Sequence, residues 1–191
     1  MDFFLAYEAF QPRFDYICRV MKRIGLISDT HGVFDDALRE FLDGVDEIWH
    51  AGDFGNFETY QAIAAFKPLR AVYGNIDGAD IRGRIKAITK FTCEDRRVMM
   101  THIGGYPGRY DARIAPMLSV EKPNIFIAGH SHILRVMYDK RHDLLYLNPG
   151  AAGIYGFHKV RTALRFEIDG ADVRKMELGE WPKSTIVRHD M

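Results

Sequence analysis

The sequence has few cysteines and no long apolar run. Its two cysteines, Cys18 and Cys93, lie far apart among 191 residues, so no disulfide framework and no CxxC motif is available. We expect free thiols in a reducing compartment and therefore a cytoplasmic protein. No apolar run approaches the about 20 residues that a membrane-spanning helix needs, so no membrane partner is predicted.

The chain also lacks net charge, because 26 lysines and arginines balance 26 aspartates and glutamates. This balance supplies no general attraction to a phosphate backbone, and the sequence gives no clear nucleic-acid partner. A hydrophobic fraction of 47% is ordinary for a globular protein with a sizeable core. The length fits one domain better than two.

The predicted domain organisation has three parts. Residues 1–21 are interpreted as an N-terminal extension, because Asp2 and Glu8 interrupt its apolar stretch and a signal peptide would not carry them. Met21 precedes a basic pair and an apolar run, which makes it a candidate for the true initiator. Residues 22–180 form the single predicted domain, and residues 181–191 a polar C-terminal tail.

Short apolar runs alternate with helical patterns in the first half of the chain. Residues 24–28, 47–51 and 69–73 are predicted to be buried strands, and residues 33–42 and 57–66 have the apolar spacing of helices. Such alternation indicates an α/β fold with a parallel sheet. In these sheets the loops that follow the carboxyl ends of the strands meet in one crevice.

The second half is richer in strands. A helix is predicted over residues 111–120, although Pro116 weakens it. The predicted strands of this half are residues 85–91, 97–101, 124–128, 134–138, 144–147, 162–168 and 173–178. No internal repeat or long linker separates them.

Side chains that bind metal ions follow five of the predicted strands. Each of them alone is typical of a polar turn, but their shared position at strand ends favours one site. Carboxylate and amide oxygens together with imidazoles suit divalent cations such as Mn, Fe, Zn, Co or Ni. The residues are Asp29, Asp53, Asn75, His102 and His130, with His31 and His132 each two positions beyond another candidate.

Several short motifs resemble one known family. Ser-Asp-Thr-His-Gly at 28–32, Gly-Asn-x-Asp at 74–77, Gly-His-Ser-His at 129–132 and Asn-Pro-Gly at 148–150 occur in that order. With Gly52-Asp53 and His102 they resemble the calcineurin-like metallophosphoesterase superfamily, specifically its small single-domain bacterial and archaeal phosphodiesterase branch. The resemblance implies a four-layer α/β/β/α sandwich.

The resemblance also implies a ligand set for two divalent cations. Manganese is expected first, with Ni, Co, Fe, Zn or Mg as alternatives. Asp53 would bridge the two cations. The first cation would be held by Asp29, His31, Asp53 and His132, and the second by Asp53, Asn75, His102 and His130.

The implied reaction is hydrolysis of a phosphate ester. A hydroxide held between the cations would attack phosphorus in line, so Asp53, Asn75 and His102 would act through it and no protein nucleophile is needed. Many relatives have a histidine directly after the metal-binding asparagine, but here the residue is Ile76. Because isoleucine cannot protonate a leaving group, small phosphodiesters are favoured over phosphomonoesters.

Substrate contacts are less well defined by the sequence. Arg109 could bind a phosphate through its guanidinium, or could be an exposed loop residue. Asn56 could orient a phosphate, or could be the N-cap of the helix that begins at residue 57. Asp77 could support Asn75 or belong to a turn, while Tyr155 and His158 could line the pocket rim or a subunit contact.

Two other classes of function share this fold. One is a non-catalytic protein-binding scaffold, as in a subunit of the eukaryotic retromer coat, in which the metal-site signature is degraded. The other is a metal-dependent nuclease, whose larger relatives carry additional domains and the histidine that Ile76 replaces. The intact ligand set favours an enzyme, and the resemblance allows a homodimer or homotetramer.

Overall fold

The computed structural model describes residues 21–183, so all of the predicted extension except Met21 and most of the predicted tail lie outside the described residues. The first half contains β1 (Lys22–Ile27), α1 (Asp36–Leu42), β2 (Glu47–His50), α2 (Phe57–Phe66), β3 (Leu69–Ala71) and α3 (Ala79–Arg82). The second half contains β4 (Ile88–Cys93), β5 (Arg96–Thr101), β6 (Gly105–Tyr106), β7 (Arg109–Tyr110), α4 (Ala115–Glu121), β8 (Ile125–Ile127), β9 (Leu134–Asp139), β10 (Leu144–Pro149), β11 (Val160–Asp169) and β12 (Asp172–Pro182). Within the described part, no helix is long and apolar enough to span a membrane.

The strands form two five-stranded sheets. The first has the order β12-β11-β1-β2-β3, and the second has the order β4-β5-β8-β10-β9. Strands β1, β2 and β3 are parallel, as the alternation of strands and helices predicted. Strands β5, β8 and β10 are also parallel, so both sheets direct several carboxyl ends to one side. The hairpin β6–β7 stands apart from both sheets.

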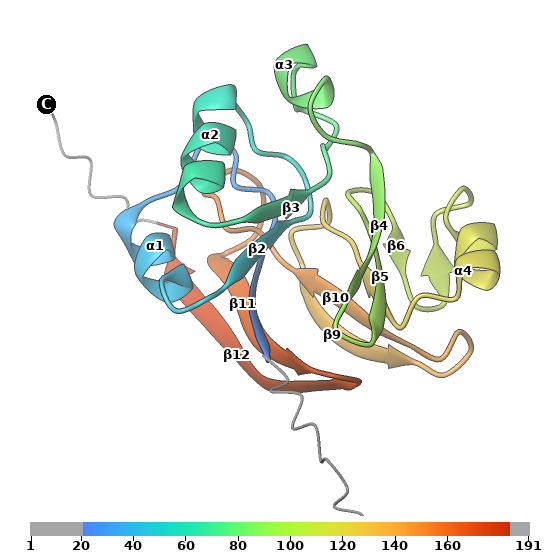
Figure 1. The fold of residues 1–191 in the computed structure, drawn as a ribbon. Coiled ribbons are helices and arrows are strands. Elements are labelled where there is room, and N and C mark those ends of the chain that lie inside the picture. The colour runs from blue at the N-terminus through green and yellow to red at the C-terminus, as the bar shows by residue number, and fades with distance from the viewer. Residues whose placement is uncertain (1–20, 184–191) are drawn as a thin grey trace, which may run out of the picture.

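Alternating side chains on the central strands build the layers. Ile24 and Leu26 of β1 pack between the sheets, whereas Ile27 packs toward α1 and α2. On β8, Ile125 lies between the sheets and Phe126 packs beneath α4. Figure 1 shows α1 and α2 on the outer face of the first sheet and α4 beside the second. The predicted four-layer α/β/β/α sandwich is therefore confirmed.

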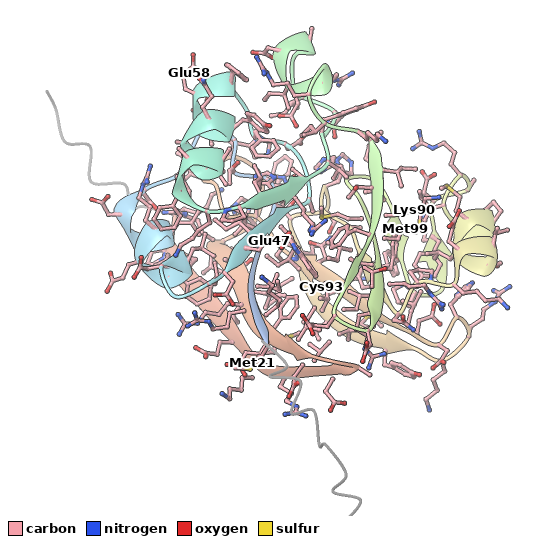
Figure 2. The ribbon with its side chains drawn as sticks, in the orientation of Figure 1. Met21, Glu47, Glu58, Lys90, Cys93 and Met99 are labelled. Atoms are coloured by element: carbon pink, nitrogen blue, oxygen red, sulfur yellow. The ribbon has the colours of Figure 1, made fainter. Side chains whose placement is uncertain are left out.

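Aromatic side chains and a thiol fill the space between the sheets. The Trp49 ring meets those of Phe91 and Phe166 edge to face, with centroids 5.0 and 5.8 Å away. Cys93 lies in the same layer (Figure 2), and its burial raises the pKa of the thiol to about 11. The residue therefore remains a free, neutral thiol and is a poor nucleophile.

Three details differ from the sequence predictions. Helix α4 begins at Ala115, so Pro116 lies in its first turn, where a missing N–H costs little. Helix α3 and the hairpin β6–β7 were not predicted, because elements of two to four residues are too short for a periodic pattern. Strand β12 continues to Pro182, so Trp181, placed in the predicted tail, packs on Phe41 within the domain.

Candidate metal centre

The loops that follow β1, β2, β3, β5 and β8 meet at one edge of the two sheets. The Asp29 N–H donates to the Gly52 carbonyl at 2.9 Å, which joins the first two loops. The Gly129 N–H donates to the His102 carbonyl at 3.0 Å, and His102 Nδ1 lies 2.7 Å from the Ala51 carbonyl across the gap between the sheets. The strand-end residues are therefore held in one crevice, as parallel strands predict.

Asp29, His31 and His132 form one cluster, in which the ligand atoms all lie within 4.8 Å of one another. His132 Nε2 lies 3.0 Å from Asp29 Oδ1 and 3.3 Å from His31 Nε2. The distance from His31 Nε2 to Asp29 Oδ1 is 3.9 Å. Two imidazoles and one carboxylate are a suitable donor set for a divalent transition metal.

Asp53, His102 and His130 form a second cluster of the same kind. His102 Nε2 lies 3.2 Å from Asp53 Oδ2 and 3.1 Å from Asn75 Oδ1. It also lies 3.9 Å from Asp29 Oδ1, so the two clusters adjoin. The structure thus brings all seven predicted ligand residues together in two neighbouring groups.

The carboxylate of Asp29 shows that the residues suit a cation. The side chain is fully buried, and its Oδ2 accepts hydrogen bonds from Ser28 Oγ at 2.6 Å and the His130 N–H at 3.1 Å. Among the described residues, Oδ1 has no hydrogen-bond partner. A buried carboxylate oxygen without a donor is costly. A divalent cation between Oδ1 and the neighbouring imidazoles would satisfy it.

The backbone at five of these residues adopts the left-handed conformation, which is uncommon outside glycine. Such conformations cost on the order of 1–3 kcal/mol each when the surroundings impose them, and they concentrate at functional sites. All five lie in the loops that follow β1, β2 and β8, within five residues of the end of the strand. The residues are Asp29, His31, Asp53, His130 and His132, with φ between 48° and 64°.

Asp77 connects the second and third loops. Its buried carboxylate accepts hydrogen bonds from the backbone N–H groups of Asp53 at 3.1 Å, Gly55 at 3.2 Å and Gly74 at 2.7 Å. A Cβ at position 74 would collide with Asp53 Oδ1, so only glycine fits there. Of the two interpretations from the sequence, support for the loop of Asn75 is the one that this geometry favours.

Asn148 has an equivalent position beside the Gly-His-Ser-His loop. Its Nδ2 donates to the Gly129 carbonyl at 2.9 Å and to Ser131 Oγ at 3.1 Å. Its Oδ1 accepts from the Gly150 N–H at 3.0 Å. The Asn-Pro-Gly motif therefore holds the loop that carries His130 and His132.

Hydrogen bonds also fix which ring nitrogen of two histidines faces the clusters. Because a carbonyl only accepts, His102 Nδ1–H donates to Ala51, and Nε2 is the ring nitrogen that faces Asp53 and Asn75 and would bind a cation. His158 Nε2 donates to the Gly153 carbonyl at 3.0 Å, so its Nδ1 accepts from His132 Nδ1, 3.2 Å away. The Nε2 lone pair of His132 is thereby directed at Asp29.

The protonation of the clusters follows from burial and mutual charge. Burial lowers the pKa of His31 and outweighs the opposing charges of Asp29 and Asp53. Burial alone would raise the pKa of Asp53, but its hydrogen bond to His102 and the charge of that ring lower it. Burial would likewise lower the pKa of His102, yet the hydrogen bond to Asp53 and the charges of both aspartates raise it. Asp53 is accordingly an anion, the form that binds metal.

The predicted substrate contacts have different surroundings. Asn56 is the N-cap of α2, since its Oδ1 accepts from the Thr59 N–H at 2.8 Å, which confirms the capping alternative. Its Nδ2 faces the Gly32 backbone. Arg109 is exposed on β7 and lines a cavity that also contains His130. The Tyr155 ring lies 6.3 Å from that of His31, at the rim of the first cluster.

His50 was not predicted to be a site residue, because a histidine at the end of a strand carries no distinctive signal. The ring is fully buried and stacks on Phe54, with centroids 3.6 Å apart. Its Nδ1 accepts from the Gly52 N–H at 3.1 Å, so Nε2–H donates to Thr30 Oγ1 at 3.0 Å. Burial holds the pKa of His50 well below its usual range, and the neutral ring joins the first and second loops.

The fold and the paired clusters define a metallophosphoesterase-type protein. The family model of the calcineurin-like phosphoesterase superfamily domain matches residues 21–171, so the chain belongs to that family. A probable metallophosphoesterase from Methanothermobacter thermautotrophicus is 30% identical over 138 residues, which are 67% of this chain and 76% of the relative.

Solved structures share the fold. Vps29 from Chaetomium thermophilum superposes with a TM-score of 0.67 and 13% identity, over 84% of this chain and 98% of that one. An archaeal phosphodiesterase superposes with a TM-score of 0.62 and 22% identity, over 82% of this chain and 99% of that one. Identities this low establish the fold alone.

Proposed function

We propose that this chain is a two-metal phosphodiesterase that hydrolyses small phosphodiesters. The observation that carries the proposal is the pair of adjoining clusters, in which a fully buried Asp29 oxygen has no hydrogen-bond partner among residues 21–183 and is surrounded by imidazole nitrogens. The family supports phosphoester hydrolysis, and the archaeal phosphodiesterase with the same fold supports the diester.

Two divalent cations bound here would polarise the phosphoryl group and lower the pKa of a water, with manganese expected first and Ni, Co, Fe, Zn or Mg as alternatives. Asp53 is proposed as the bridging ligand, as membership of the calcineurin-like phosphoesterase superfamily implies. The proposed ligands are Asp29, His31, Asp53 and His132 for one cation and Asp53, Asn75, His102 and His130 for the other.

The protein residues around the clusters offer little covalent chemistry. Cys93 is a neutral thiol between the sheets, and the Ser28 hydroxyl already donates to Asp29. The side chain of Ile76, directly after Asn75, is 47% exposed at the crevice and cannot supply a proton. The site is therefore expected to prefer diesters whose leaving groups need little acid assistance.

Comparison of two aryl substrates tests this function. We expect bis(p-nitrophenyl) phosphate to be hydrolysed with a kcat/KM at least about tenfold above that for p-nitrophenyl phosphate, because Ile76 cannot act as a general acid. The assay is run with Mn, Ni, Co, Mg and Zn, each added to chelator-treated protein. A clear preference for the monoester would contradict the proposed role of Ile76.

A protein-binding scaffold is the second candidate. It is favoured by the Vps29 fold and by apolar side chains exposed beside the first cluster, namely Ile133, Tyr155 and Phe157. A protein that hydrolyses neither aryl ester with any of the metals, yet binds a protein partner tightly, would support the scaffold.

Metal-dependent cleavage of plasmid DNA would instead support a nuclease. Light scattering tests for the homodimer or homotetramer.

His158 is predicted to be a positioning residue for His132. Replacement of His158 by alanine removes the acceptor that holds the His132 ring, and should weaken metal binding about 10- to 100-fold. Glutamine, which keeps an acceptor, should restore part of the affinity. Calorimetric titration of metal-free protein with Mn²⁺ measures both variants against His142→Ala, a histidine bonded to Asp139 instead. Equal affinities for His158→Ala and the unmodified protein would rule out this role.

A further inference from the structure

A cavity of about 330 Å³ opens beside the second cluster, and His130 belongs to both. The hairpin β6–β7 and the first residues of β9 enclose the cavity. Its apolar walls include Ile103 and Ile133, and aromatic rings such as Tyr106 complete it. Since His130 both lines the cavity and belongs to the cluster, a substrate bound at the cluster would place one of its ester arms here.

Two arginines in this cavity have no acidic partner. Within residues 21–183, neither Arg109 nor Arg135 makes a side-chain hydrogen bond or an ion pair. The Arg135 guanidinium lies over the Tyr106 ring, 4.0 Å from its centroid, which fixes it against the cavity wall. Two unpaired guanidinium groups in one cavity are therefore available to a ligand.

Two other polar groups of the wall are already engaged. The Asp111 carboxylate is held by Arg113 through contacts of 2.9 and 3.2 Å, so it does not neutralise the free arginines. The Tyr146 hydroxyl donates to the Gly105 carbonyl at 2.7 Å. The cavity consequently presents net positive charge without internal compensation.

A second cavity, of about 270 Å³ and beside Asn75 and His102, has a different character. Its Arg82 donates to the backbone carbonyls of Asp77 at 2.7 Å and Asn75 at 2.8 Å, which occupies the guanidinium. The remaining walls are mainly apolar, with Ile88 and Ile114 among them. Of these two cavities in the described part of the chain, the one beside His130 therefore offers the uncompensated cations.

We propose that the cavity beside His130 is a subsite for an anionic ester arm, so that the preferred substrates are phosphodiesters with a second phosphate group on one arm. The planar guanidinium groups of Arg109 and Arg135 would bind that phosphate in bidentate fashion. Ile103 and Ile133 would contact the apolar part of the same arm. This inference rests on the proposed phosphodiesterase function and gives Arg109 a specific ligand.

Dinucleotides test the subsite, because a 5′-terminal phosphate can be added without changing the internal diester. We expect kcat/KM for the internal diester of the 5′-phosphorylated dinucleotide to exceed that of the unphosphorylated one by at least about tenfold. In the Arg109→Gln/Arg135→Gln double variant this ratio should fall close to one. The matched control, Arg141→Gln, removes an exposed charge from the β9–β10 turn and should keep the ratio.

Equal rates on both dinucleotides, in a protein that hydrolyses bis(p-nitrophenyl) phosphate, would overturn the subsite and leave the proposed function intact. Failure on all three diesters would instead reject the proposed function. Binding is measured independently of catalysis by adding inorganic phosphate to metal-free protein and following backbone amide NMR signals. Saturable shifts around Arg109 and Arg135, lost in the double variant, support the subsite, and their absence from the unmodified protein contradicts it.

Discussion

Asp53→Ala is expected to abolish metal-dependent hydrolysis and to reduce bound metal at the same time. Asp53 Oδ2 lies 3.2 Å from His102 Nε2, and Oδ1 accepts from the Ile76 N–H at 3.1 Å, so the carboxylate is held in place at the second cluster. Loss of several kcal/mol of transition-state stabilisation by the metal ions lowers kcat by about a thousandfold or more. Steady-state hydrolysis of an aryl diester and metal analysis of the same sample measure both effects.

The matched control for this experiment is Asp43→Ala. It removes the same charge from an exposed position at the end of α1, and it should retain both hydrolysis and metal content. Circular dichroism of the Asp53→Ala protein verifies that the variant is folded. Full hydrolysis by folded, metal-free Asp53→Ala protein would disprove a mechanism that depends on metal.

Asp35→Ala is expected to cause a large loss of stability, because this half-buried loop residue pairs with a buried arginine. The Arg161 side chain is fully buried, and its two terminal nitrogens donate to Asp35 at 2.6 and 2.9 Å, while Nε donates to the Ala152 carbonyl. Removing the carboxylate leaves a buried, unpaired charge, which costs about 3–5 kcal/mol. Loss of the helix cap to the Leu38 N–H adds about 1 kcal/mol. Urea unfolding measures the sum.

Asp35→Asn separates the charge from the cap, because asparagine still caps α1. Burial would raise the pKa of Asp35, but the hydrogen bonds and charge of Arg161 lower it. A folded-state pKa below the unfolded value gives stability that is present above about pH 4 and is lost as the pH falls through the folded-state pKa. The stability gap between Asp35→Asn and the unmodified protein should therefore shrink on acidification, and a gap independent of pH would contradict the ion pair.

The fold was largely predictable, because most strands and helices bury one face and so leave a pattern in the sequence. The run from residue 24 to residue 28 and the helical spacing of residues 57–66 reappear as β1 and α2. The gathering of metal-binding residue types at strand ends was also predictable, because parallel strands bring their carboxyl ends together.

The supporting network was not predictable, since it depends on contacts between distant segments. His50 lies at the end of a strand and looks like any polar boundary residue, but the structure stacks it on Phe54. His158 lies 26 residues beyond His132, yet the two rings share a hydrogen bond. The left-handed backbone of Asp29 and Asp53 also depends on the neighbouring loops, because aspartate is enriched in that conformation but adopts it at only a small fraction of its positions.

Anomalous diffraction from crystals grown with Mn²⁺ locates bound metal ions independently of activity. We expect two strong manganese peaks in each molecule. One should lie among Asp29, His31 and His132, and the other among Asp53, His102 and His130, with Asp53 in contact with both. A single peak, or peaks away from these residues, would contradict a two-metal centre.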